Sequence, residues 1–255
     1  MTKSVVAAFA LGCLVMFGSI GSARAYSLRH TSEGKQVRWY RGSVTLKMDA
    51  KIDRLMAGRN ARASAIMASE AWRGLPGTPD IVIEDGEPPA YDRARRGNGI
   101  YLLSEWPYSP EQVAITLVTY QSTGEILGAD ILVNGSKRFG MLSEDGSSAL
   151  AAEHDLAAVL THEFGHLLGL DDSHDDEEAS MWPYIRAGEA HQRSLSQDDE
   201  EAAVDAYSGA AALPAAAACS VSAGPGQSAG SVNALFALLF AAAVAVRGAR
   251  CARNR

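Results

Sequence analysis

The chain has 255 residues, enough for one ordinary domain with extensions, and 47% of them are hydrophobic, enough for a real core. Two of the 23 basic residues lie in 1–25 and four lie in 219–255, while all 30 acidic residues lie between these ends. Residues 26–218 therefore carry 17 basic and 30 acidic residues, a net charge of −13. This balance repels a phosphate backbone and excludes nucleic acid as an expected partner.

Residues 1–25 have the pattern of a secretory signal peptide. Lys3 gives a basic start, Val5–Ile20 is apolar, and Ala23-Arg24-Ala25 places small residues at the cleavage positions. The alternative is a membrane anchor, but the apolar run is short for a spanning helix. We expect the mature chain to begin at Tyr26 and the protein to be exported, either to the extracellular space or to the cell surface.

Strand and helix patterns follow one another across residues 26–208, which we expect to form one domain. Alternating apolar residues or short apolar runs predict five strands, at Ser43–Asp49, Ile81–Ile83, Ile100–Leu103, Ile115–Tyr120 and Asp130–Val133. Helical spacing predicts three helices, at Ile52–Trp72, Asp155–Leu168 and Ser196–Tyr207. The first helix should bury Ile52, Leu55, Met56, Ala63, Ile66 and Met67, and Asp155 should cap the second. This order predicts an α+β fold.

The second helix carries the sequence His162-Glu163-x-x-His166. Residues four apart share a helix face, so both imidazoles can bind one zinc ion. Glu163 is rotated away from that face and can reach a metal-bound water instead, where it would serve as general base. Gly169 lies where a glycine can adopt the positive φ that ends a helix and turns the chain.

Two residues after the helix are candidates for the third zinc ligand. Asp172 lies three residues past Gly169, and a carboxylate joins two histidines in other zinc hydrolases. His174 is the softer ligand, but it lies two positions further on and would require the loop to bulge. We favour Asp172 and keep His174 as the alternative. The neighbouring acids Asp171 and 175–178 are expected to form a solvated loop, with calcium binding as the alternative.

The extended motif from His162 to Asp172 resembles the zinc motif of the metzincin proteases. Ala179-Ser180-Met181-Trp182-Pro183-Tyr184 is similar to the metzincin Met-turn, and Leu195–Asp199 with Ala206-Tyr207 is similar to the final helix of matrixins. The resemblance implies a metzincin-like domain over 26–208 with a five-stranded mixed sheet, two long helices and a C-terminal helix. It further implies that Met181 forms an apolar floor under the zinc and that Pro183 and Tyr184 form the wall of a specificity pocket.

The resemblance implies a zinc-dependent endopeptidase that hydrolyses peptide bonds in proteins, with Glu163 as general base and then acid. The strand at Ile115–Tyr120 would be the edge along which a protein or peptide substrate lies. A monomer is expected. Two alternatives remain open: an inactive zinc-stabilised surface module that binds a partner, and a zinc hydrolase acting on cell-wall peptides.

The C-terminal end differs in composition from the rest of the chain. Residues 209–218 form an alanine-rich linker, and 219–255 contain Cys219, an apolar stretch at Ala234–Val246 and four arginines. This tail resembles the cysteine-type surface-sorting signals of myxobacteria, which implies a sorting protease as a partner and transient membrane contact. A simple tail anchor is the alternative. Residues 26–218 contain no cysteine, so the domain should depend on its core and on metal.

Overall fold

The computed structural model describes residues 26–56, 61–94, 97–142 and 153–208. All of them lie in the first of the two units into which the chain divides, residues 1–216. The expected signal peptide, linker and sorting tail fall outside the described residues. Within the described ranges, no helix has the length and apolar character needed to cross a membrane.

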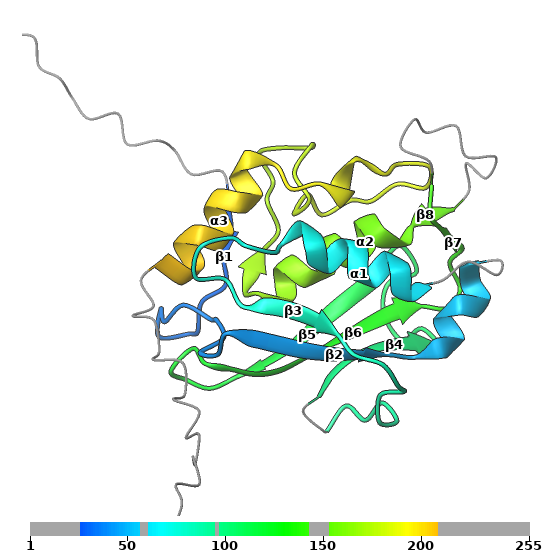
Figure 1. Cartoon of the computed structure of the whole chain (residues 1–255), viewed down its shortest axis with the longest axis horizontal. Coiled ribbons are helices and arrows are strands. Elements are labelled where there is room, and N and C mark those ends of the chain that lie inside the picture. Colours follow the sequence, from blue (N-terminus) through cyan, green and yellow to red (C-terminus); the bar gives the residue numbers. More distant parts are fainter. Residues whose placement is uncertain (1–25, 57–60, 95–96, 143–152, 209–255) are drawn as a thin grey trace, which may run out of the picture. The chain divides into compact units, whose positions relative to one another are not determined.

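A five-stranded mixed sheet forms the centre of the fold (Figure 1). Its strands are β2 (Ser43–Met48), β3 (Asp80–Ile83), β4 (Asn98–Leu103), β5 (Ala114–Tyr120) and β6 (Ile126–Asn134). They lie in the order β3-β2-β4-β6-β5, and only β5 runs antiparallel to its neighbour. β5 is therefore an edge strand, with one row of backbone groups directed out of the sheet.

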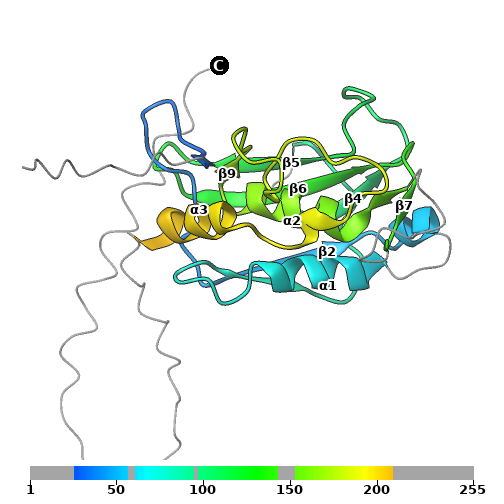
Figure 2. The same ribbon diagram turned by 90° about the horizontal axis from the view of Figure 1, so that it is seen from above.

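Two helices, α1 (Ala61–Ala71) and α2 (Leu156–Leu167), lie on the same side of the sheet (Figures 1 and 2). They pack against each other, with α1 next to β3 and α2 next to β5. A third helix, α3 (Gln197–Ser208), ends the described part of the chain. The prediction of an α+β fold with a mixed sheet, two helices and a C-terminal helix is confirmed.

Helix α2 is held in place by its burial and by its N-terminal cap. Its residues are buried except His166, and its N-terminus is capped by Asp155, whose carboxylate accepts a hydrogen bond of 2.9 Å from the Ala158 N–H. The same buried carboxylate accepts hydrogen bonds from Arg193 and from the Leu142 N–H. This one side chain thus ties the start of α2 to Leu142, which precedes the helix, and to Arg193, which follows it.

Short pairings complete the frame around α2. β1 (Ser27–Leu28) pairs antiparallel with β9 (Leu170–Asp171), directly after the helix, so that Ser27 lies opposite Asp171. β7 (Phe139–Gly140) pairs parallel with β8 (His154–Asp155) directly before it. Both ends of the helix are therefore anchored to distant segments of the chain.

The prediction of one helix across 52–72 is wrong. A 3-10 helix, η1, occupies Ala50–Met56, and α1 begins at Ala61. Ile66 and Met67, which we expected in the core, are 36% and 40% exposed. The buried face of α1 consists instead of small residues, Ala61, Ser64, Ala65, Ala68 and Ser69. Small side chains allow α1 to approach α2 and β3 closely. The apolar pattern of the sequence instead predicts that the larger residues are buried.

Candidate metal centre and cleft

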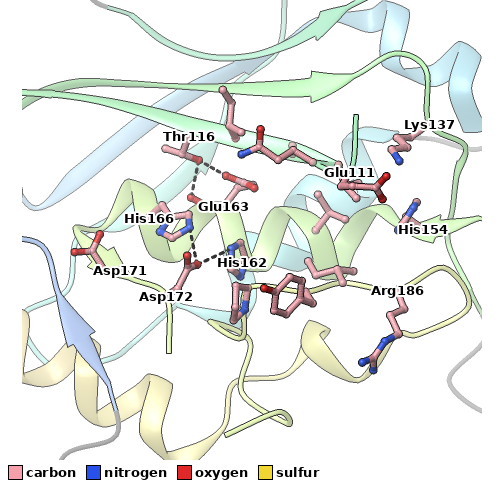
Figure 3. Close-up of a pocket in the computed structure, with 18 of the residues that line it drawn as sticks. Glu111, Thr116, Lys137, His154, His162, Glu163, His166, Asp171, Asp172 and Arg186 are labelled. Atoms are coloured by element: carbon pink, nitrogen blue, oxygen red, sulfur yellow. Dashed lines mark hydrogen bonds and ion pairs between the residues drawn. The ribbon is translucent and has the colours of Figure 1, made fainter. Parts of the chain in front are cut away.

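His162 and His166 lie one turn apart on α2, with ring centroids 4.7 Å from each other (Figure 3). Their Nε2 atoms lie 3.5 Å and 3.3 Å from Oδ1 of Asp172. In a tetrahedral zinc site with bonds of about 2.0–2.1 Å, two ligand atoms are roughly 3.3–3.4 Å apart. The two observed separations therefore match the edges of a zinc tetrahedron.

The other nitrogen of each ring is held by the backbone. His162 Nδ1 lies 2.8 Å from the carbonyl oxygen of Ser180, and His166 Nδ1 lies 2.9 Å from that of Leu170. A carbonyl oxygen can only accept, so each Nδ1 carries the hydrogen and donates it. In the neutral rings the Nε2 lone pairs then face Asp172, which is how histidines are prepared for a metal.

Asp172 reaches the histidines because the chain reverses at Gly169. This glycine has a φ of +92°, in the left-handed region, and its N–H donates to the His166 carbonyl at 3.0 Å. A Cβ at this position would lie 2.1 Å from the Val37 carbonyl oxygen, so a larger residue does not fit. β9 follows directly and leads into Asp172.

The charges of the three residues are coupled. Burial lowers the pKa of His162, and neighbouring His166 lowers it further. Burial also acts to lower the pKa of His166, but its hydrogen bond to Asp172 and the charge of Glu163 outweigh this, and the pKa is raised. Burial acts to raise the pKa of Asp172, yet the two histidines bring it below its usual value. The carboxylate is thus ionised and shared by both rings.

The structure brings Asp172, and not His174, to the two histidines. Among the described residues, these three form the one group of metal-ligating side chains whose ligand atoms all lie within 4.8 Å of one another. The His174 ring packs near Trp182 instead, with centroids 6.4 Å apart. Asp171 is paired with Arg29, whose Nε lies 2.7 Å from its Oδ1. No second cluster of this kind involves the acids at 175–178 in the described part of the chain.

Glu163 is buried beside the histidines and is held from the sheet. The Thr116 hydroxyl on β5 donates to the Glu163 carboxylate, with Oγ1 2.6 Å from Oε2 (Figure 3). The same hydroxyl oxygen lies 3.1 Å from the backbone oxygen of Glu163. Nothing in the sequence pattern marks Thr116, because it is one of two threonines in an ordinary strand.

Met181 lies buried against α2 beside Gly165. The contact is possible because residue 165 is glycine: a Cβ there would lie 2.1 Å from Met181 Sδ. Asp199 on α3 holds the turn that contains Ser180 and Met181. Its carboxylate accepts hydrogen bonds from the N–H groups of Ser180 at 2.7 Å and Met181 at 3.1 Å. In the sequence Asp199 belongs only to a helix motif, and its link to the turn appears only in the fold.

His162, His166 and Asp172 line one cleft that follows the edge strand, together with Glu163 and Thr116. Ser27, Arg29 and Asp171 lie towards one end, Ala114–Thr116 of β5 form one side, and Pro183–Ala187 form the other. Tyr184 is 64% exposed on this second side. Glu111, Lys137, His154 and Arg186 gather at the opposite end (Figure 3). Burial and then the charge of Lys137 lower the pKa of His154.

Comparison with known families agrees with this geometry. The family model described as Matrixin matches residues 103–208, which include β5, α2, Asp172, Met181 and α3. The match covers less than half of the chain, and no curated protein matches the chain. Residues 103–208 are thus similar to matrixins, a family of zinc-dependent metalloproteases, and the mixed sheet with its helices is consistent with a matrixin or metzincin catalytic domain.

Proposed function

We propose that the protein is a zinc-dependent endopeptidase in which His162, His166 and Asp172 bind one zinc ion. The observation that carries the proposal is the arrangement of these three side chains, with two Nε2 atoms 3.5 Å and 3.3 Å from one carboxylate oxygen. The hydrogen bonds that hold both Nδ1 atoms support it, because such partners fix the tautomer and the ring orientation of ligating histidines.

Zinc at this position supplies an acidified water and polarises a peptide carbonyl. Glu163 is the general base in this proposal: its carboxylate accepts a proton and afterwards delivers it to the amine that leaves. Glu163 follows His162 on the helix and so lies beside the proposed ligands. It is not itself one of them, because it is not among the three side chains whose ligand atoms lie together. Met181 supports the histidines from below, and Pro183 and Tyr184 form part of the substrate-binding wall.

An extended peptide is the substrate that the cleft fits. β5 is an edge strand, so a peptide can add to it through main-chain hydrogen bonds. Residues Ala114–Thr116 of this strand line the cleft beside Glu163, which would bring a peptide bond to the ligands.

The test is proteolysis by the full chain. We expect it to cleave casein or gelatin, to stop on addition of a zinc chelator and to recover when zinc is restored. Glu163→Ala should keep its zinc and lose activity by about 100- to 10,000-fold. Glu200→Ala, an exposed glutamate on α3, is the matched control and should behave as the wild type.

Two other functions would give different results. A binding module would hold zinc and yet cleave no member of a broad peptide library; the presence of Glu163 with a hydroxyl directed at its carboxylate favours the enzyme. A hydrolase of cell-wall peptides would release fragments from peptidoglycan and leave proteins intact. Parallel digests of protein and peptidoglycan therefore separate the three functions.

Export and surface sorting are part of the proposal and rest on sequence alone. Residues 1–25 would direct secretion, and 219–255 would be recognised by a sorting protease at Cys219. Fractionating cells that express the full chain or Cys219→Ala would show whether that cysteine affects retention at the surface. Calcium binding by the acidic loop stays a prediction, to be tested by adding calcium to the zinc-loaded protein.

A further inference from the structure

Thr116 lies at the point where the sheet meets the catalytic helix. Its Oγ1 is 2.6 Å from Oε2 of Glu163 and 3.1 Å from the backbone oxygen of the same residue. A hydroxyl carries a single hydrogen, and the shorter contact is to the charged acceptor, which forms the stronger bond. The hydrogen is therefore directed at the carboxylate.

The strand determines where this hydroxyl points. Thr116 pairs with Ile131 of the neighbouring strand β6, in a part of β5 whose register is regular, and alternate residues of a strand face opposite sides. The β-branched side chain has few rotamers, so strand position and pairing largely fix the hydroxyl. Among the described residues, no other side chain donates a hydrogen bond to the Glu163 carboxylate.

This contact has a direct effect on the base. A glutamate side chain has several rotatable bonds, and a proton acceptor has to be held in place for efficient transfer. The hydrogen bond at Oε2 sets the direction of the carboxylate, whose remaining lone pairs can still accept a proton. Because Thr116 belongs to the strand that lines the cleft, the same segment that would align the substrate also aligns the base.

We infer that Thr116 is a positioning residue that holds the Glu163 carboxylate for proton transfer. The inference rests on the proposed peptidase function and deepens it. Thr116 does not bind the metal and does not need to touch the substrate; it acts through Glu163. A side chain of the same shape without a hydroxyl should therefore slow the chemical step and leave substrate binding unchanged.

The experiment compares three variants of the zinc-loaded full chain on one peptide substrate. Thr116→Val keeps the shape and removes the hydroxyl, while Thr116→Ser keeps the hydroxyl and removes the methyl group. Thr45→Val, at an exposed position on β2, is the control for the same replacement elsewhere in the sheet. We expect Thr116→Val to lower kcat about 10- to 100-fold with KM within twofold of wild type. The other two variants should stay within about threefold of wild type.

Two outcomes would overturn the inference. If Thr116→Val retains the wild-type kcat, the hydroxyl has no part in catalysis. If Thr116→Ser loses as much activity as Thr116→Val, the methyl group and strand packing matter, and the hydrogen bond does not. Equal zinc content in all variants is required for the comparison, and it is measured on the same samples.

A structural measurement tests the positioning role of Thr116 without an activity assay. Crystal structures of the zinc-free wild type and Thr116→Val should show a single Glu163 rotamer in the former and a displaced or divided carboxylate in the latter. An unchanged, singly occupied rotamer in Thr116→Val would refute the positioning role. If the wild type cleaves no peptide, the proposed function fails, and this measurement still reports on Thr116.

Discussion

The carboxylate of Asp199 accepts a hydrogen bond of 3.1 Å from the Met181 N–H, and so joins the last helix to the turn that contains Met181. The same side chain accepts from Ser180, whose carbonyl in turn orients His162. Asp199 also exchanges hydrogen bonds with Ser196 at the start of α3, as in a capping box. One buried side chain thus connects helix initiation with ligand orientation.

Asp199→Ala should therefore weaken both folding and metal binding. It leaves the N–H groups of Ser180 and Met181 without their acceptor, so we expect a loss of about 3 kcal/mol in the free energy of unfolding. Zinc affinity should fall about 10- to 100-fold, as it does when outer partners of ligands are removed. Urea unfolding and competition with a zinc chelator measure the two effects. Glu200→Ala is the control, and equal behaviour of both variants would contradict the prediction.

Replacement of the two candidate ligands separately should distinguish them. Asp172→Ala is expected to lose most of its zinc, because it removes the oxygen that both Nε2 atoms face. His174→Ala should keep one zinc per chain, since its ring packs near Trp182 and outside the ligand group. Metal content after gel filtration gives the answer. Retention of zinc by Asp172→Ala together with its loss from His174→Ala would show that the loop rearranges when it binds metal.

Gly165→Ala should destabilise the protein although alanine favours helices. The helix itself would gain about 1 kcal/mol from the change. The new Cβ, however, would lie 2.1 Å from Met181 Sδ and 3.1 Å from the Trp72 ring, and overpacking of this kind costs about 1–3 kcal/mol. Thermal unfolding should therefore show a lower midpoint. Gly42→Ala, where nothing lies within 4 Å, is the control; a raised midpoint for Gly165→Ala would mean that Met181 moves aside freely.

Asp130 gives the stability a pH dependence that one substitution should remove. Burial raises its pKa from 3.8 to about 6, against the smaller opposing effect of the Gly99 N–H. The folded state then binds more protons than the unfolded state between these values, so this residue lowers stability as pH rises from about 4 to 6. Asp130→Asn keeps an acceptor for Gly99, and its stability relative to wild type should increase over that window by at most about 3 kcal/mol. Urea unfolding without added calcium at pH 4, 5, 6 and 8 measures the difference, and a constant difference would refute the prediction.

Most strands and two helices could be predicted because their apolar patterns are strong. Val44, Leu46 and Met48 alternate with polar residues and are buried as expected. Helix α1 could not be placed well, because its contacts use alanine and serine, which carry little signal of burial. The two-residue strands β1 and β9 were also missed, since so short a pairing depends on distant contacts and leaves no periodicity.

The candidate site divides in the same way. His162, Glu163 and His166 lie within one helix, so their spacing in the sequence is enough to predict that they lie close together. Thr116 and Asp199 reach the site from a strand and from the last helix, and only the fold reveals their contacts. Sequence pattern identifies groups that share an element, whereas groups that meet across elements require the tertiary structure.

The pairing of β1 with β9 and the contact of Asp199 with Met181 also bear on the order of folding. The segment that leads to Asp172 pairs with residues 27–28, and the turn at Ser180 and Met181 is held by Asp199. The first of these contacts joins segments far apart in the sequence and forms late, because a long stretch of chain must first be ordered. The second contact needs the last helix. A growing chain that lacks α3 would not yet have a supported site. The proposed proteolytic activity would therefore arise only when the domain is complete, which would limit damage to the cell that makes it.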